Sequence, residues 1–234
     1  MKILAFDTAA SACSAALWRD GRLAAHRFER MERGQSEALI PMVMATLADA
    51  GEPLSGLDLI AVTVGPGAFT GLRIGLAAAK GFSLAAGIPC LGVTTFDAVA
   101  HAVPDEERES ARLLVILETK REDVYAQAFD AALRPLTAPE AVTLEALPDF
   151  VRPHVAGRFL IAGDAAARAI TALGAEGSGL RAVADAGVPD ARHVAAIAAA
   201  RFRPGMELPP LAPLYLRPPE ARLPKAGGRL RPDV

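Results

Sequence analysis

The sequence predicts an α/β protein made of two similarly organised lobes in tandem. Three observations support this fold class. A strand–glycine loop–helix–strand unit spans residues 59–93, three antiparallel strands precede it, and the same order of elements recurs after residue 112. A strand buried on both faces is a nearly continuous apolar run, and a glycine loop after it that leads into a helix is typical of α/β units. The recurrence is what predicts two lobes rather than one.

The central unit is a βαβ crossover with a glycine-rich loop at the end of its first strand. Residues 59–64 form the first strand and residues 90–93 the second. Between them we predict a helix over residues 71–86, with Thr70 as its N-cap and Gly87 as the glycine that ends it. Such a crossover is right-handed by default, so the helix packs on the sheet that its two strands share.

The chain before this unit predicts three strands and a helix. The strands are Ile3–Asp7, Ala12–Arg19 and Arg22–Phe28. Asp20-Gly21, between the second and third, is a strong hairpin signal. The helix covers residues 35–50, and its predicted core side carries Leu39, Ile40, Val43 and Leu47. With a further helix over residues 96–103, capped by Thr94 or Thr95, this is the order of a ribonuclease H-like lobe.

The second half repeats this pattern less regularly. The predicted strands are Leu113–Glu118, Val124–Phe129, a weak one at Leu133–Leu136, and Phe159–Ala162. The predicted helices are Leu144–Val155, a segment from Asp164 to Leu173, and His193–Phe202, with a loop at Gly174–Gly187. From Pro204 onward prolines exclude long regular elements, and Leu214–Leu216 is expected to pack back as an extended anchor.

We divide the chain into three parts. Residues 1–104 form a first lobe that carries two candidate partner-binding helices, and residues 105–206 form a second lobe. Residues 207–234 are a proline-rich segment that ends in a basic tail.

Composition restricts the classes of function. The 234 residues are 52% hydrophobic and 22% charged, which is ordinary for a folded protein. A net charge of −2 and a pI near 6.1 disfavour a protein that holds nucleic acid mainly through its own overall electrostatic field. A strand begins within two residues of Met1, which leaves no room for a signal peptide, and Lys80 interrupts the longest apolar stretch. We therefore expect a cytoplasmic protein without a membrane contact.

Two helices present unusually apolar outer faces and predict a surface for another chain. The helix over residues 71–86 is apolar nearly all round, and glycine spacing within it favours close approach of another backbone. The candidate interface residues are Pro41, Met42, Met44, Ala45, Ala48, Gly71, Leu72, Arg73, Gly75, Leu76, Ala78, Ala79 and Phe82. On this hypothesis Gly75→Leu abolishes association and leaves the fold of the single chain intact.

The glycine loop also suggests an anion or nucleotide site. Backbone N–H groups and a helix N-terminus bind anions, and the candidate residues are Asp7, Gly65, Gly67 and Thr70. The loop lacks the Lys-Ser/Thr pair of a Walker A motif, so we favour the alternative that its glycines permit close packing of the strand and helix.

Residues for independent chemistry are sparse. The four histidines have no metal-ligand spacing, and no Gly-x-Ser-x-Gly elbow is present. Cys13 and Cys90 are expected to be buried free thiols. Asp7 and Glu118 both end strands and are the pair considered for Mg²⁺, although such carboxylates are often only solvated or hydrogen-bonded. We therefore predict neither a catalytic nor a metal site.

Specific strings resemble a known family. Ile3-Leu4-Ala5-Phe6-Asp7-Thr8, the run from Gly65 to Gly75, Gly92-Val93-Thr94-Thr95 and Pro213-Leu214-Tyr215-Leu216-Arg217 are similar to the TsaB (YeaZ) family, relatives of the glycoproteases. The Gly-Pro-Gly-x-Phe-Thr-Gly-x-Arg string is the most specific. The resemblance implies two actin-like ATPase (ASKHA) lobes.

The resemblance also implies a non-catalytic scaffold in the making of threonylcarbamoyladenosine beside the tRNA anticodon. The scaffold pairs with its main partner, TsaD, through its first two long helices, self-associates through them when alone, and works with TsaE. Transfer RNA is reached through the complex, no cofactor is bound independently, and ATP or ADP with Mg²⁺ acts at the level of the complex. Gln35 stands where the family often has histidine, and Glu118-Thr119-Lys120 stands where it often has Asp-Ala-Arg.

The alternative is a small-molecule kinase or ATPase of the same fold. It requires a second phosphate-binding hairpin at the start of the second lobe. Glu118-Thr119-Lys120-Arg121 lacks the glycine that lets such a hairpin approach a phosphate closely.

Overall fold

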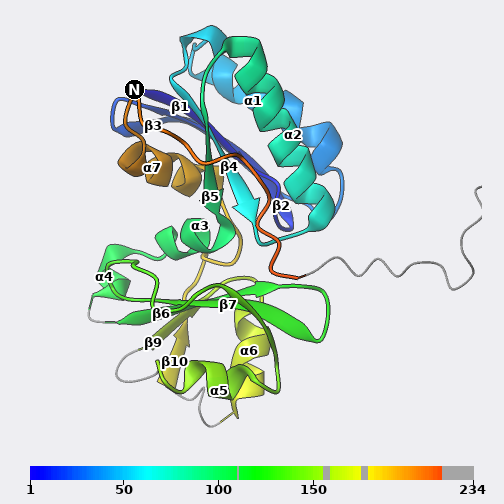
Figure 1. The fold of residues 1–234 in the computed structure, drawn as a ribbon, viewed down its shortest axis with the longest axis vertical. Coiled ribbons are helices and arrows are strands. Elements are labelled where there is room, and N and C mark those ends of the chain that lie inside the picture. The colour runs from blue at the N-terminus through cyan, green and yellow to red at the C-terminus, as the bar shows by residue number, and fades with distance from the viewer. Residues whose placement is uncertain (110, 155–158, 175–178, 218–234) are drawn as a thin grey trace, which may run out of the picture.

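The protein folds into two α/β lobes, seen one above the other in a computed structural model (Figure 1). The structure describes residues 1–109, 111–154, 159–174 and 179–217. The basic tail beyond Arg217 and residue 155, the predicted end of one helix, therefore lie outside the described residues.

The first lobe has a five-stranded sheet in the order β3-β2-β1-β4-β5. Its elements in chain order are β1 Lys2–Asp7, β2 Ala12–Arg19, β3 Arg22–Arg30, α1 Gln35–Asp49, a 3₁₀ turn Leu54–Gly56, β4 Leu59–Gly65, α2 Phe69–Ala86, β5 Cys90–Thr94 and α3 Thr95–His101. Strands β1, β2 and β3 are antiparallel, whereas β4 and β5 run parallel to β1. This is the sequence of elements predicted from residues 3–103.

The second lobe repeats this topology, because its sheet has the order β8-β7-β6-β9-β10. Its elements are α4 Asp105–Arg108, β6 Arg112–Glu118, β7 Asp123–Phe129, β8 Glu140–Thr143, α5 Leu147–Val151, β9 Phe159–Ala162, α6 Ala166–Leu173 and β10 Leu180–Ala182, and α7 Ala191–Arg201 follows. Reading the five strands of each sheet in chain order gives the same arrangement, which confirms the predicted repeat.

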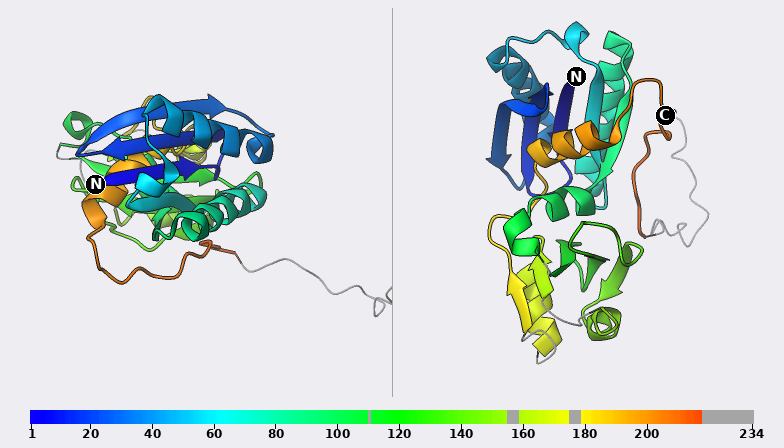
Figure 2. Two further views of the ribbon diagram at one scale, coloured as in Figure 1. Left: turned by 90° about the horizontal axis from the view of Figure 1, so that it is seen from above. Right: turned by 90° about the vertical axis from the view of Figure 1, so that its left-hand side faces the viewer.

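Helices cover both faces of the first sheet. Helices α1 and α2 pack on one face, where Leu39, Val43 and Leu76 meet the apolar residues of β1 and β4. Helix α7 packs on the other face against β1 and β2, through Val194 and its neighbours (Figures 1 and 2). The prediction that α7 belongs to the second lobe, residues 105–206, was therefore wrong. Its apolar face matches either sheet equally well, so periodicity could not decide between them.

Helix α3 lies between the lobes and ties them together. Its Phe96 and Val99 share one apolar cluster with Leu113 and Val115 of β6. Leu216, from the segment that follows α7, packs against that cluster. The segment of residues 203–217, called the strap below, runs from the end of α7 along the first lobe toward the second (Figure 2).

Several local predictions were wrong. The third strand of the second sheet is β8, not Leu133–Leu136, of which Pro135 makes only an isolated bridge to Phe129. Strand β10 falls inside the stretch predicted as a loop. Helix α5 begins at Leu147 and not at the predicted Leu144, because Pro148 occupies its first turn, and it ends at Val151, before Pro153. The N-cap of α2 is Ala68 and not Thr70, which lies inside the helix.

The two cysteines are free thiols, as predicted. Cys13 is buried, which was also predicted, whereas Cys90 is only half-buried. Burial raises the pKa of the Cys13 thiol to about 12. No helix in the described part of the chain combines the length and apolar character that crossing a membrane requires.

Candidate functional site

An exposed apolar flank runs along α1 and α2, which lie side by side against the first sheet (Figure 1). Leu84 is 87% exposed, Met44 52% and Ile40 44%. The other exposed residues of the two helices include the small or apolar Pro41, Ala48, Ala77, Gly81 and Ala85, and also the charged Lys80. Large apolar side chains that gather on one flank are typical of a surface that another chain covers. Ile40 was wrongly predicted to face the core.

The structure divides the predicted interface residues into three groups. Pro41, Met44, Ala48 and Arg73 are exposed, and Met42, Ala45, Ala78 and Phe82 are half-buried. Gly71, Leu72, Gly75, Leu76 and Ala79 are buried in the chain's own core, so these five do not lie on an outer surface. They were predicted wrongly because α2 is apolar on both sides, and periodicity cannot tell its own sheet from a partner.

The buried glycines bring α2 close to the turn that follows β1. A Cβ at Gly71 would lie 2.0 Å from the carbonyl oxygen of Thr8, and one at Gly75 would lie 2.8 Å from Thr8 Oγ1. The Thr8 hydroxyl donates a hydrogen bond to the Gly71 carbonyl at 2.8 Å. Gly75→Leu would therefore disrupt the fold of the single chain, contrary to the hypothesis that it only blocks association.

The loop before α2 packs in the same way. A Cβ at Gly67 would lie 2.3 Å from the carbonyl oxygen of Ala9, which accepts a hydrogen bond from the Ala68 amide at 2.7 Å. Gly65 is buried, has a φ of +110° and lies beneath the strap. A Cβ at this position would lie 2.9 Å from the carbonyl oxygen of Leu214. Close packing accounts for these glycines, as the favoured alternative proposed.

Asp7 is buried and does not line an open site. Its Oδ1 accepts hydrogen bonds from the Thr63 hydroxyl and, at 3.1 Å, from the Ala9 amide, while Oδ2 has no partner among the described residues. Burial raises the pKa of Asp7 to about 7. The described residues contain no group of three or more side chains placed to hold a metal ion.

A cleft of about 1020 Å³ lies between the lobes and the strap. Its first-lobe wall includes Gly67, Thr70 and Arg33, its second-lobe wall includes residues 117–121, and strap residues 214–217 close one side. Of the predicted anion-site residues, Gly67 and Thr70 line this cleft, whereas Asp7 and Gly65 do not. Glu118 lines it without Asp7, so the two carboxylates do not face each other across it.

The strap is fixed by backbone, aromatic and ionic contacts, which confirms its predicted role as an extended anchor. The Leu214 amide donates to the Val64 carbonyl at 2.7 Å. The rings of Phe69 and Tyr215 stack with centroids 5.6 Å apart, and the Arg73 guanidinium lies 3.7 Å from the centre of the Phe69 ring. Arg73 Nε also donates to the Tyr215 hydroxyl at 3.3 Å. Arg73 therefore holds the strap on α2.

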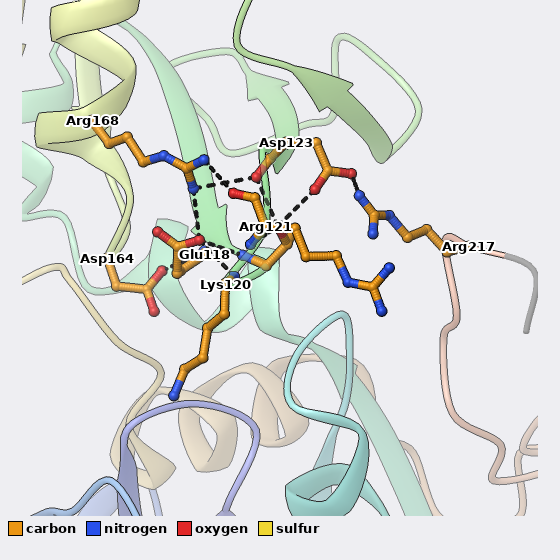
Figure 3. A network of polar contacts seen from close by, with 8 residues as sticks. Glu118, Lys120, Arg121, Asp123, Asp164, Arg168 and Arg217 are labelled. Carbon is orange, nitrogen blue, oxygen red and sulfur yellow. Dashed lines mark hydrogen bonds and ion pairs between the residues drawn. The ribbon is translucent and has the colours of Figure 1, made fainter. Parts of the chain in front are cut away.

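The hairpin between β6 and β7 is occupied by the protein's own groups (Figure 3). Glu118 Oε1 accepts hydrogen bonds from the amides of Thr119 and Lys120, at 2.9 and 2.7 Å, and from Arg168 Nη1 at 2.8 Å. Arg168 donates a further bond to the Arg121 carbonyl. The loop amides that would face a phosphate in a nucleotide-binding hairpin are thus bonded to a carboxylate.

Two ion pairs join the hairpin region to other parts of the molecule. Asp123 pairs with Arg217 of the strap (Figure 3). Lys120 pairs with Glu32 of the first lobe at 3.2 Å. The Lys120–Glu32 pair is exposed on both sides and contributes little to stability, roughly 0–1 kcal/mol.

Comparison with known proteins finds relatives of this chain by sequence and by structure. A family model described as "TsaD: tRNA N6-adenosine threonylcarbamoyltransferase" matches residues 29–147. The tRNA threonylcarbamoyladenosine biosynthesis protein TsaB of Escherichia coli is 39% identical over 125 residues, which are 53% of this chain and 53% of that protein. The solved structure titled "YeaZ from Pseudomonas aeruginosa" superposes with a TM-score of 0.75 at 28% identity, over 92% of this chain and 99% of that one.

The chain belongs to the TsaB (YeaZ) family.

The match to the curated TsaB protein spans about half the length of either chain, whereas the YeaZ structure matches nearly end to end. A more distant structure, the activator of 2-hydroxyisocaproyl-CoA dehydratase from Clostridium difficile, has a TM-score of 0.50 at 11% identity. At that identity it supports the fold alone, and it agrees with the predicted pair of actin-like ATPase lobes.

Sequence reasoning missed several residues at these sites. Ile40 and Leu84 were not among the predicted interface residues, although Leu84 lies opposite the small-residue face of α2 on a helical projection. Thr95 was predicted only as a helix cap, yet it lines the cleft, and its hydroxyl has no hydrogen-bond partner in the part of the chain that the structure describes. Arg168 gave no signal, because nothing in the local sequence of α6 indicates that it reaches a hairpin some 50 residues earlier in the chain.

Proposed function

We propose that this chain is the TsaB-type subunit of the machinery that makes threonylcarbamoyladenosine in tRNA, and that it acts as a scaffold without chemistry of its own. Its apolar α1/α2 flank binds a TsaD-type partner, and the free chain self-associates through the same flank. A TsaE-type protein and tRNA join through the complex, where ATP or ADP with Mg²⁺ would act. Family membership and the TsaB-named relative support the pathway.

The observation that carries the scaffold role is the exposure of Leu84, Met44 and Ile40 on adjoining helices. Covering a fully exposed side chain of this size is worth up to about 1.5–3 kcal/mol. Leu84 is close to that limit, and Met44 and Ile40 are about half as exposed. The exposed area of these three side chains together supplies a driving force for association.

The kinase or ATPase alternative is less well supported by the geometry. Its second phosphate-binding hairpin would have to be the Glu118–Asp123 turn. The amides of Thr119 and Lys120 bond to Glu118 there, and Arg168 bonds to Glu118 and to the Arg121 carbonyl. Hydrolysis of ATP by the purified chain alone, above the rate without protein, would favour this alternative over the scaffold role.

The scaffold role is tested with two variants of the exposed surface, one on the α1/α2 flank and one away from it. Met44→Glu/Leu84→Glu places two charges on the flank, and Leu136→Glu places one on an exposed apolar residue of the second lobe. We expect the double variant to lose co-elution with the cognate TsaD-type protein in size-exclusion chromatography, while Leu136→Glu co-elutes as the wild type does. Circular dichroism should show all three chains folded. Normal co-elution of the double variant would contradict the proposed interface.

A further inference from the structure

The walls of the interlobe cleft are more basic than the rest of the chain. Three acidic residues line the cleft, Glu32, Glu118 and Asp164, against five basic ones, Arg33, Arg73, Lys120, Arg121 and Arg217. The lining therefore has a net charge of +2, whereas the whole chain has −2. Glu118 is paired with Arg168 and Arg217 with Asp123, both partners lying outside the lining, so leaving these two out does not change the excess. A local excess of positive charge in an acidic chain favours an anionic occupant.

The rim also carries aromatic rings beside these cations. Phe69 is 55% exposed and Tyr215 44%, and both line the cleft with the half-buried Tyr125. Proteins that bind single-stranded nucleic acid combine a positive groove with aromatic faces on which bases stack. The outer face of the Phe69–Tyr215 stack has that character, and Arg73 adds a guanidinium plane next to it.

Two polar features of the cleft, the Thr95 hydroxyl and the N-terminus of α2, have no side-chain partner among the described residues. Thr95 is 1% exposed and lines the cleft, and its Oγ1 has no hydrogen-bond partner among the described residues. Leaving a buried hydroxyl unpaired costs free energy, which a bound donor or acceptor would recover. Independently, the 18-residue helix α2 begins at the cleft without a side-chain cap among the described residues, and its first residues, Phe69 to Gly71, line the cleft. The N-terminus of a helix favours an anion.

We propose that this cleft and its rim bind RNA directly, and that the cleft receives unpaired nucleotides of a single-stranded loop. The inference deepens the proposed function, on which it rests for the presence of an RNA substrate. Phosphates contact the α2 N-terminus and the cations Arg33 and Lys120, bases stack at Tyr215, and Thr95 Oγ1 bonds a base or a ribose hydroxyl.

The geometry favours an RNA strand over a free nucleotide. A nucleoside triphosphate in a two-lobed fold of this kind needs phosphate donors from both lobes, and the second-lobe amides are bonded to Glu118. The cations are instead spread over the turn before α1, over α2, over the second-lobe hairpin and over the strap, which suits successive phosphates of a chain. At about 1020 Å³ the cleft is also at the upper end of the range for small-ligand pockets, roughly 300–1,000 Å³.

Two variants separate RNA contact from a structural role. Arg33→Glu/Lys120→Glu reverses two exposed rim charges, of which Arg33 has no ion pair in the described part of the chain. Its matched control is Arg22→Glu, an exposed arginine at the opposite end of β3. Thr95→Val keeps the shape of the side chain and removes only the unpaired hydroxyl, so it should leave the melting temperature unchanged or raise it.

Binding is measured by fluorescence anisotropy with a labelled tRNA anticodon stem-loop, using the full chain alone and in complex with the cognate TsaD-type protein. We expect the double variant to bind at least about tenfold more weakly and to reduce the slope of log K against log salt by about two, one for each phosphate contact. Arg22→Glu should stay within about twofold of the wild type, and Thr95→Val should weaken binding several-fold without loss of stability.

Three results would overturn the inference. One is binding of the stem-loop that none of the cleft variants changes, and another is absence of binding to both the free chain and the complex. The third is displacement of the RNA by ADP or ATP that itself binds more tightly, which would assign the cleft to a free nucleotide. Co-elution with the TsaD-type protein is scored on the same samples. RNA binding that fails while pairing persists therefore leaves the proposed function standing, and failed pairing overturns that function separately.

Discussion

Gly71→Ala and Gly81→Ala make the same change at two positions of one helix and should have opposite effects on stability. A Cβ at Gly71 would lie 2.0 Å from the Thr8 carbonyl oxygen, whereas a Cβ at Gly81 would meet nothing within 4 Å. Since real Cβ atoms do not come within about 3 Å of a backbone oxygen, the start of α2 must move by roughly 1 Å in the first variant.

The magnitudes follow from these two surroundings. Alanine is favoured over glycine inside an exposed helix by about 1 kcal/mol, so Gly81→Ala should stabilise the chain by roughly that amount. A forced shift of packed backbone costs about 3 kcal/mol, of which the gain in helix propensity offsets at most about 1 kcal/mol, so Gly71→Ala should lose about 2 kcal/mol. At about 2–4 °C per kcal/mol, the melting temperatures of the two variants should differ by roughly 6–12 °C.

Differential scanning calorimetry at a concentration where the chain is monomeric measures this difference. Gly81→Ala is also the control for any effect of the substitution on the unfolded chain, which is the same at both positions. Equal melting temperatures, or a stabilised Gly71→Ala variant, would refute the conclusion that the glycines of α2 serve its contact with Thr8.

Two further predictions concern pH. Burial raises the pKa of Asp7 to about 7, so the folded chain holds this proton more tightly than the unfolded chain does. Stability should therefore fall as pH rises from about 4 to 7. In urea titrations at successive pH values, Asp7→Asn should remove this dependence of stability on pH. Burial is the main cause that lowers the pKa of His193 to about 4, and the neighbouring His101 adds to it. The Nδ1 atoms of the two rings lie 3.1 Å apart and share one proton at most. Stability should therefore fall as pH drops from about 6.5 to 4, and His193→Gln should reduce this loss. An unchanged slope in either variant would show that the other groups of the chain set its pH dependence.

Most of the fold could be predicted from local pattern. Strand β4 is a buried apolar run, Asp20-Gly21 forms the hairpin between β2 and β3, and Gly87 ends α2 with a φ of +69°. These features depend on residues that are neighbours in sequence. The recurrence of the strand order was also visible, because each lobe has its own apolar runs in the same succession.

The predictions that failed depend on contacts distant in sequence. Helix α7 is apolar through Val194 and Ile197, but only the folded chain shows that it returns to the first sheet, where the Ala191 amide also bonds to Ser14 Oγ at 2.9 Å. Strand β8 exposes three of its four residues and so lacks the apolar run that would have predicted it.

The candidate site shows the same division between local and distant information. An apolar outer face on α1 and α2 was predicted, whereas the side of α2 that its own sheet covers was not, because both sides of that helix are apolar. Tyr215 was expected to lie in an extended anchor, but its stack on Phe69 joins residues far apart in the chain. The cleft could not be predicted at all, since its walls come from both lobes and the strap.

Sedimentation velocity of the purified chain, alone and mixed with its cognate TsaD-type protein, tests the central claim most directly. We predict that the chain self-associates as its concentration rises and that the partner replaces the self-associated form with a one-to-one complex. If the chain sediments as a monomer at every concentration, and does so unchanged when the partner is present, the proposal that the α1/α2 flank binds another protein is contradicted.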